Sequence, residues 1–178
     1  ATPAGDGRDL EAFDGDEVEA GTVTYRQIVE TGGRTIEMTA TRTVAETTLP
    51  DGAAAIVVVD QAQSPMGSAV DSTFMDPETL RPLRRSLHQG PVFIEIFFRA
   101  DSIVGKIDAG PQQMPIATAS EGVVFATGAA LDVALATLDE EDDGATLQVF
   151  EVLEGKVAER RLLGGLEDVQ EIAGRRRE

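Results

Sequence analysis

The sequence predicts a mainly β domain, in which a large antiparallel sheet carries one short helix packed on its face. Apolar and polar residues alternate with a period of two over most of the chain, as they do in strands with one buried and one solvated side. Turn residues recur at roughly ten-residue intervals, which is the spacing of short antiparallel strands. Only one segment has the leucine spacing of a helix.

The first three predicted strands span residues 22–30, 34–47 and 53–60. Gly32 and Gly33 supply the positive φ angles of a tight hairpin between the first two. The second strand carries threonine at most alternate positions, and this β-branched residue tolerates a solvated sheet face. The third contains a continuous β-branched run, which is typical of a buried central strand.

Four more strands are predicted at residues 66–75, 80–88, 92–99 and 102–108. The turns between them contain proline or glycine, as in Asp76-Pro77 and Gly90-Pro91. Segment 92–99 is the most apolar of the chain. Its alternation puts two sets on opposite faces: Val92, Ile94, Ile96 and Phe98 on one, and Phe93, Glu95 and Phe97 on the other.

The helix is predicted at residues 129–138, followed by strands at 145–153, 156–163 and 169–172. Leu131, Leu135 and Leu138 fall on one helical stripe. Thr127-Gly128 precedes the segment as a candidate N-cap, and the acidic run 139–143 ends it. We expect the leucine stripe to face the sheet.

Composition indicates one globular domain of 178 residues. We divide the chain into a flexible acidic N-terminal segment (1–20), a single β-rich domain (21–174) and a basic tail (175–178). The start of the chain has the small, acidic character of a segment that follows a cleaved signal peptide. No apolar window of about 18 residues is present, so we expect no transmembrane segment.

The charge of the chain argues against nucleic-acid partners. A formal net charge of −17 repels DNA, RNA and anionic membrane surfaces. Lys106 and Lys156 are the only lysines, so 13 of the 15 basic residues are arginine, which suits a high-GC or salt-loving organism. The absence of cysteine excludes disulfides, thiol catalysis and cysteine-bound metals.

No catalytic constellation stands out, and we expect a protein that is not an enzyme and has no cofactor or metal site. His88 is the only histidine, so neither a two-histidine metal site nor a Ser–His–Asp triad has support. The acidic run 139–143 lacks the spacing of a calcium loop. Hydrolysis by paired carboxylates remains an alternative, with Asp71, Asp76 and Glu95 as its candidates.

Seven apolar residues form a candidate ligand-binding set. They could line a groove for an acyl chain, since each buried CH₂ contributes about 0.8 kcal/mol. The same side chains could instead form the core under the helix, and the sequence leaves both readings open. The set comprises Tyr25, Met38, Phe74, Ile94, Ile96, Phe98 and Phe150.

The segment from 71 to 152 resembles an uncharacterised family of exported bacterial proteins. The similarity rests on Asp71, on the turn residues Asp76, Pro77, Thr79, Leu80 and Pro82, on Val104 and Gly105, and on Leu131, Leu135 and Leu138. That family is thought to share the half-barrel of the periplasmic lipoprotein carriers LolA and LolB. The resemblance implies a curved sheet around an apolar concavity, and export to the periplasm or cell envelope.

We therefore expect a non-enzymatic binding module of the cell envelope, with a lipid or another apolar ligand on the concave face of the sheet. The alternative is a structural or protein-interaction domain of the envelope that pairs with a protein partner through a sheet edge and binds no small ligand.

Overall fold

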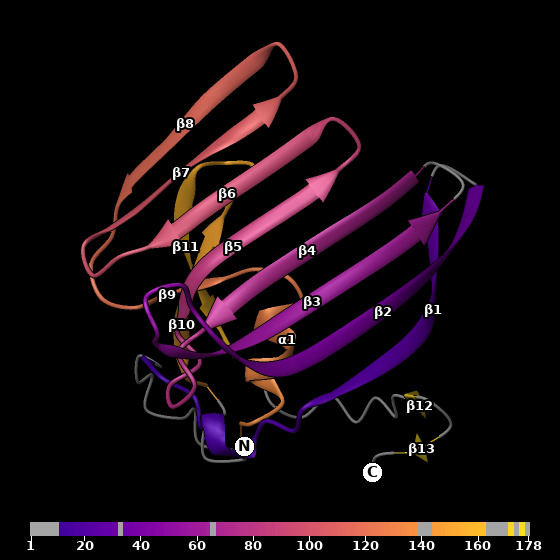
Figure 1. Cartoon of the computed structure of the whole chain (residues 1–178). Coiled ribbons are helices and arrows are strands. Elements are labelled where there is room, and N and C mark those ends of the chain that lie inside the picture. The colour runs from indigo at the N-terminus through magenta and orange to yellow at the C-terminus, as the bar shows by residue number, and fades with distance from the viewer. Residues whose placement is uncertain are drawn as a thin grey trace.

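The computed structural model describes residues 11–31, 34–64, 67–138, 144–162, 171–172 and 175–176. Eight strands form one antiparallel sheet in which each strand pairs with its neighbours in chain order (Figure 1). These strands are β1 (Gly21–Thr31), β2 (Arg34–Thr48), β3 (Ala54–Ser64), β4 (Gly67–Met75), β5 (Pro82–Gln89), β6 (Val92–Phe98), β7 (Ser102–Ala109) and β8 (Gln112–Ala119).

A smaller sheet and one helix lie against this large sheet. The smaller sheet has the order β11-β10-β9 and contains β9 (Val124–Ala126), β10 (Thr146–Glu151) and β11 (Lys156–Arg161). Strand β9 runs parallel to β10, and the helix α1 (Ala129–Leu135) connects the two. Short elements complete the chain: the 3-10 turn η1 (Gly15–Glu17), β12 (Glu171–Ile172) and β13 (Arg175–Arg176).

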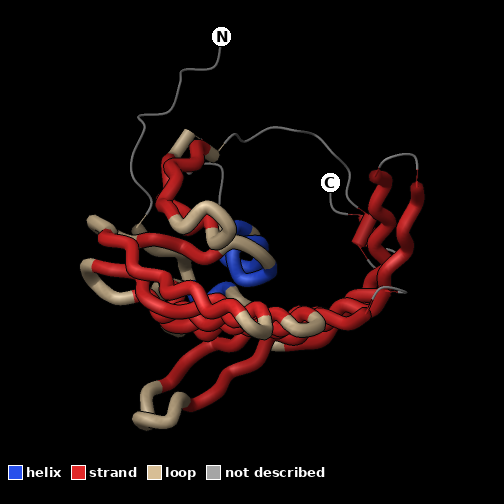
Figure 2. The backbone as a smooth tube through the Cα atoms, turned by 90° about the horizontal axis from the view of Figure 1, so that it is seen from above, coloured by secondary structure: helices blue, strands red, loops and turns tan. Residues whose placement is uncertain are grey.

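The large sheet is curved and open, and α1 lies on its inner side (Figure 2). A mainly β fold, in which one short helix packs on a curved antiparallel half-barrel, is therefore confirmed. Among the residues described, no helix has the length and apolar character needed to cross a membrane.

The structure contains three strands that the sequence did not predict: β8, β9 and the two-residue β13, which lies in the predicted basic tail. Strand β8 includes Pro115, which lacks an N–H and usually argues against a strand. Its position at the sheet edge explains the exception, because an edge strand pairs on one side only, here with β7. Strand β9 has three residues, too few for an alternating pattern to be recognised. The predicted hairpin at Gly32-Gly33 lies outside the described residues.

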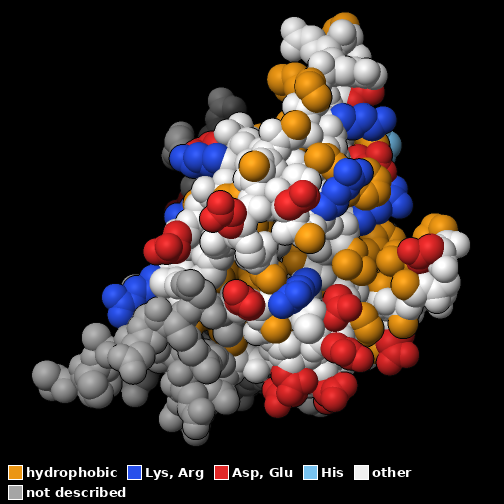
Figure 3. All heavy atoms as spheres, turned by 90° about the vertical axis from the view of Figure 1, so that its left-hand side faces the viewer, with side chains coloured by type: hydrophobic (Ala, Val, Ile, Leu, Met, Phe, Trp, Pro, Cys, Tyr) orange, Lys and Arg blue, Asp and Glu red, His pale blue; other side chains and the backbone are white. Residues whose placement is uncertain are grey.

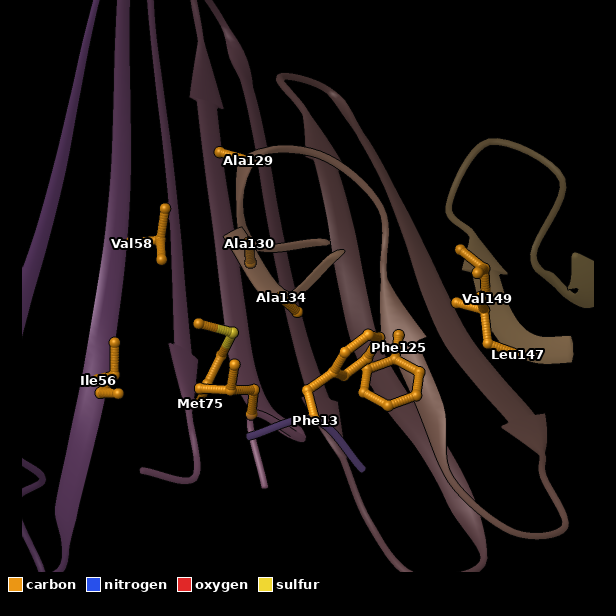
Figure 4. Close-up of a cluster of buried hydrophobic side chains, with 11 residues drawn as sticks. Phe13, Ile56, Val58, Met75, Phe125, Ala129, Ala130, Ala134, Leu147 and Val149 are labelled. Atoms are coloured by element: carbon orange, nitrogen blue, oxygen red, sulfur yellow. The ribbon is translucent and has the colours of Figure 1, made fainter. Parts of the chain in front are cut away.

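Helix α1 is shorter than predicted, and its leucine stripe does not make the closest contact with the sheet. Ala129, Ala130 and Ala134 are buried, whereas Leu131 and Leu135 are only partly buried. Figure 4 shows the three alanines facing the strands that carry Val58 and Met75. Small side chains let the helix backbone approach the sheet, and the leucines pack against the core cluster as partly buried residues.

Two apolar clusters form the core. The first lies between α1 and strands β3, β4 and β10, and the second lies between β6–β8 and the smaller sheet. The first contains Phe13, Ile56, Val58, Met75, Leu80, Phe125, Ala129, Ala130, Ala134, Leu147 and Val149. The second contains Ile94, Ile96, Ile103, Ile116, Val124 and Phe150.

Residues 11–18 are anchored to the domain, although the sequence analysis placed them in a flexible segment. The Phe13 ring packs edge-to-face on Phe125, with ring centroids 4.8 Å apart. The backbone N–H of Gly15 donates to the carbonyl of Glu78 at 3.0 Å. A Cβ at Gly15 would lie 1.8 Å from the Pro77 carbonyl oxygen, so only glycine permits this approach. Composition alone could not reveal that one phenylalanine anchors an acidic segment.

Candidate ligand-binding face

The inner face of the large sheet contains a row of small residues. Cross-strand register aligns Ala40 of β2, Ala62 of β3 and Ala69 of β4, and we call these three residues the alanine row. Tyr25 of β1 stands opposite Ala40 at the end of this row. In Figure 1, α1 lies behind the lower ends of β3 and β4, and the strands extend well beyond it. Ala62 and Ala69 are partly exposed on this face, whereas Ala40 is buried.

A pocket of about 260 Å³ opens at one end of the alanine row, and we call it the Met38 pocket. It lies between the β3–β4 and β5–β6 connections, and most of its lining is apolar or small. The lining residues are Met38, Ala62, Gly67, Ser68, Ala69, Gln89, Gly90 and Pro91.

A second row of residues, which is polar, crosses the same face next to the alanine row. It consists of Arg42, Asp60 and Asp71, which are direct cross-strand neighbours on β2, β3 and β4, and we call it the polar row. The Arg42 guanidinium donates to both oxygens of Asp60, at 2.9 and 3.0 Å, and the Tyr25 hydroxyl donates to Asp60 at 3.2 Å. Arg42 also donates to Asp132 of α1 at 3.0 Å, which connects the helix to the sheet.

The pKa values of two groups in this ion-pair network are raised. Hydrogen bonding to Asp60 raises the pKa of Arg42, so the guanidinium stays charged. Desolvation by burial, followed by the negative charge of Asp60, raises the pKa of Tyr25. The phenol is therefore a hydrogen-bond donor and not a base at neutral pH.

A second ion pair holds the segment that leads into α1. The Arg85 guanidinium donates to both oxygens of Asp71, at 3.0 and 2.6 Å, and to the Thr127 hydroxyl at 2.9 Å. Arg85 is only 8% exposed. Gly128 has a φ of +95°, and a Cβ there would lie 3.1 Å from an Arg85 nitrogen. The adjacent carboxylates of Asp60 and Asp71 thus have one arginine each, and these pairs position α1 over the sheet.

The structure does not bring the seven predicted ligand residues together. Ile94, Ile96 and Phe150 are buried in the second core cluster, and Phe98 packs against it with its ring 6.5 Å from that of Phe150.

The other three predicted ligand residues lie away from that cluster. Tyr25 and Met38 share the inner face with the alanine row, whereas Phe74 faces the opposite side of the sheet, in register with Arg84 and Phe97. Only Met38 lines the Met38 pocket.

The three candidate carboxylates for hydrolysis are also apart. Glu95 lies on the outer face, where Arg84 donates to it at 2.6 Å, whereas Asp71 lies on the inner face. Asp76 accepts three hydrogen bonds within its own turn, and the bond from the Thr79 hydroxyl is the main cause of its lowered pKa.

The remaining candidates for chemistry are His88 and clusters of acidic side chains. His88 is exposed, and its ring stacks edge-to-face on Phe93 with the centroids 5.5 Å apart. Within the described ranges, no group of three histidine, cysteine, aspartate or glutamate residues could hold a metal ion. The acidic run 139–143 lies outside those ranges. On the side of the molecule shown in Figure 3, acidic side chains are spread over the surface, with basic and hydrophobic ones between them.

Sequence reasoning missed the alanine row and the two arginine–aspartate pairs. Each of these residues occupies an inward-facing position of its strand, which the alternation could have indicated. Their alignment into rows depends on the register between strands, and register is a property of the folded sheet.

Comparison with known proteins found no relative. No family model matches the chain, no curated protein sequence matches it, and no solved structure matches it. The function is therefore argued from the geometry of the inner face.

Proposed function

We propose that this domain is a non-enzymatic binding module of the bacterial cell envelope. Its ligand is a lipid acyl chain or another apolar molecule, held on the concave face of the sheet. The observation that carries this proposal is the Met38 pocket, whose floor contains the partly exposed Ala62 and Ala69 of the alanine row. The compartment, periplasm or cell envelope, rests on the resemblance to the exported half-barrel family.

The size of the Met38 pocket limits the ligand. At about 260 Å³ it is slightly below the range of roughly 300–1,000 Å³ for drug-sized ligands. It therefore suits part of an acyl chain, and the remaining carbons would lie along the alanine row. Six buried CH₂ groups would contribute about 5 kcal/mol before the cost of association is subtracted.

The polar row gives the ligand a defined orientation. Asp60 and Asp71 are already paired with arginines, so an apolar ligand does not leave a carboxylate without a partner. Tyr25 lies between the alanine row and the polar row, with an apolar ring and a hydroxyl bonded to Asp60. We expect acyl carbons to contact this ring.

The test compares two leucine substitutions on β3. Ala62→Leu adds three carbons inside the Met38 pocket, whereas Gln61→Leu adds an apolar side chain on the opposite face. We expect purified protein to carry lipid in native mass spectrometry and to bind a fluorescent fatty acid. Ala62→Leu should weaken this binding about tenfold, and Gln61→Leu should not. Absence of lipid and of probe binding, or equal affinities of the two variants, would refute the proposal.

A second candidate function, a protein-interaction domain, is favoured by the edge strand β1. It has 11 residues and contains no proline, and among the residues that the structure describes it pairs only with β2. Such an edge offers backbone groups to a strand of another protein. Light scattering after size exclusion at increasing concentration tests self-association through this edge. A monomer at every concentration, with no partner recovered by crosslinking in cells, would count against this candidate.

A further inference from the structure

A second pocket, of about 380 Å³, lies where β5 begins and β6 ends. The segment before β9 forms another wall, and we call this site the Arg81 pocket. It is separate from the Met38 pocket, with which it shares no lining residue. Its lining includes one acidic residue, two arginines and several apolar residues, among them Glu11, Arg81, Pro82, Phe98, Arg99 and Val124.

Within the described part of the chain, neither arginine of this pocket forms an ion pair, although the charge of Arg81 helps to lower the pKa of Asp76. Among those described residues, neither Arg81 nor Arg99 has a carboxylate oxygen within 4.0 Å, whereas Arg84 and Arg85 each contact one carboxylate and Arg42 contacts two. The Nε of Arg81 donates to the Glu11 carbonyl at 3.1 Å, which orients the guanidinium and leaves its terminal nitrogens available. In a chain with 32 acidic and 15 basic residues, two such arginines beside one pocket form a local site for an anion.

The floor of the Arg81 pocket is apolar and firmly packed. Val124 is buried in the second core cluster, and Phe98 packs against that cluster. Pro82 is also buried. Because these residues belong to the core, the floor is formed before any ligand binds, and less ordering is required on association.

We propose that the Arg81 pocket binds an organic carboxylate with an apolar body. The carboxylate would accept hydrogen bonds from the guanidinium groups of Arg81 and Arg99, and planar guanidinium groups match this geometry. The apolar body would lie on Pro82 and Phe98. The volume of about 380 Å³ falls within the range of small-molecule sites. The net charge of −17 does not prevent binding, because charges beyond about 8 Å are screened at physiological ionic strength.

The test uses octanoate as the probe, titrated into the full chain and followed by calorimetry and by amide chemical shifts. Arg81→Gln/Arg99→Gln should raise the Kd about tenfold or more, since hydrogen bonds to ionised groups are the strong ones. Arg161→Gln, at an exposed arginine of β11, is the matched control and should leave the Kd unchanged. The neutral analogue octan-1-ol should bind at least tenfold more weakly than octanoate.

Two further variants separate this site from the Met38 pocket. Octanoate also has the acyl chain expected to enter the Met38 pocket, so the two sites are distinguished by their amide chemical shifts. Ala62→Leu should leave unchanged the Kd obtained from the amides of Val123 and Val124 in the Arg81 pocket, and the two proposals can therefore fail independently. Glu11→Gln keeps the backbone carbonyl that orients Arg81 and removes a neighbouring negative charge, so it should tighten octanoate binding about twofold.

Three results would overturn the carboxylate site. They are no octanoate binding at millimolar concentration, the same Kd in the double arginine variant, and loss of binding in Ala62→Leu alone. Displacement of octanoate by an equal concentration of inorganic phosphate would contradict the role of the apolar floor.

Discussion

Replacing Asp76 by alanine tests how the turn between β4 and β5 is held. One carboxylate oxygen of Asp76 accepts from the Thr79 hydroxyl at 2.7 Å, from the Thr79 N–H at 2.8 Å and from the Glu78 N–H at 3.1 Å. The carbonyls of Glu78 and Thr79 in turn receive the N–H groups of Gly15 and Phe13. The substitution therefore weakens both the turn and the docking of the N-terminal segment.

The magnitude follows from these contacts. Hydrogen bonds to charged groups contribute about 1.5–3 kcal/mol, and the loss of a capping side chain costs about 0.5–2 kcal/mol. We expect Asp76→Ala to lower the free energy of unfolding by about 2 kcal/mol, which is a fall in Tm of roughly 4–8 °C for a chain of this size. Asp51→Ala is the matched control, since Asp51 accepts one bond, from Ala53 at 3.1 Å, and should cost about 0.5 kcal/mol.

The pKa of Asp76 is lowered in the folded protein, chiefly by the Thr79 hydroxyl, and this gives the pH dependence a sign. The stability that the carboxylate contributes is present above its unfolded pKa, near 3.8, and is lost as the pH falls through the lower folded value. The stability gap between the unsubstituted protein and Asp76→Ala should therefore be constant at neutral pH and narrow below about pH 4.

The assay is urea denaturation followed by far-UV circular dichroism at several pH values between 3 and 7. Comparing differences between two proteins cancels the titration of the other acidic residues. A gap that does not change between pH 7 and pH 3, or one no larger than that of Asp51→Ala, would refute the role assigned to the Asp76 carboxylate.

Three further substitutions test the core and the attachment of α1, each by urea denaturation. Phe150→Ala removes a side chain that is 0% exposed in the second core cluster and should cost about 3–5 kcal/mol; a loss under 1 kcal/mol would contradict the packing described. Gly128→Ala should destabilise more than Gly52→Ala, because both glycines have a φ near +90° but only Gly128 has Arg85 beside its missing Cβ; equal losses would exclude that contact. Asp71→Ala leaves Arg85 buried without its partner and should cost about 3–5 kcal/mol, whereas adding Arg85→Met should restore part of that loss; additive effects would argue against a coupled pair.

The sequence predicted one lining residue of the Met38 pocket and neither arginine of the Arg81 pocket. Met38 was identified as a possible ligand residue from its apolar character, and it lines a pocket. The sequence did not predict Ala62 and Ala69 as ligand residues. A small side chain indicates a pocket only when the folded structure leaves space above it, and the sequence does not show that space. Arg81 and Arg99 line one pocket because antiparallel pairing places the start of β5 beside the end of β6.

The strands were accessible from the sequence because alternation is a local property of an extended backbone. Successive side chains of a strand point to opposite faces of the sheet. Burial of one face therefore produces an apolar–polar alternation within each strand, which can be read without knowing its neighbours. The turns were accessible for the same reason, since Gly52 and Gly90 occupy positive φ angles that other residues disfavour. The leucine spacing likewise identified the segment that contains α1.

Tertiary structure decided how these elements meet. Whether leucines or alanines of α1 contact the sheet depends on how close the helix axis comes to it. The hydrogen bonds from Arg42 to Asp132 and from Arg85 to Thr127 influence that approach. The arginine–aspartate pairs, the alanine row and the packing of Phe13 on Phe125 each join residues that lie far apart in the sequence. Such contacts come from strand register and packing between layers, and no local pattern encodes them.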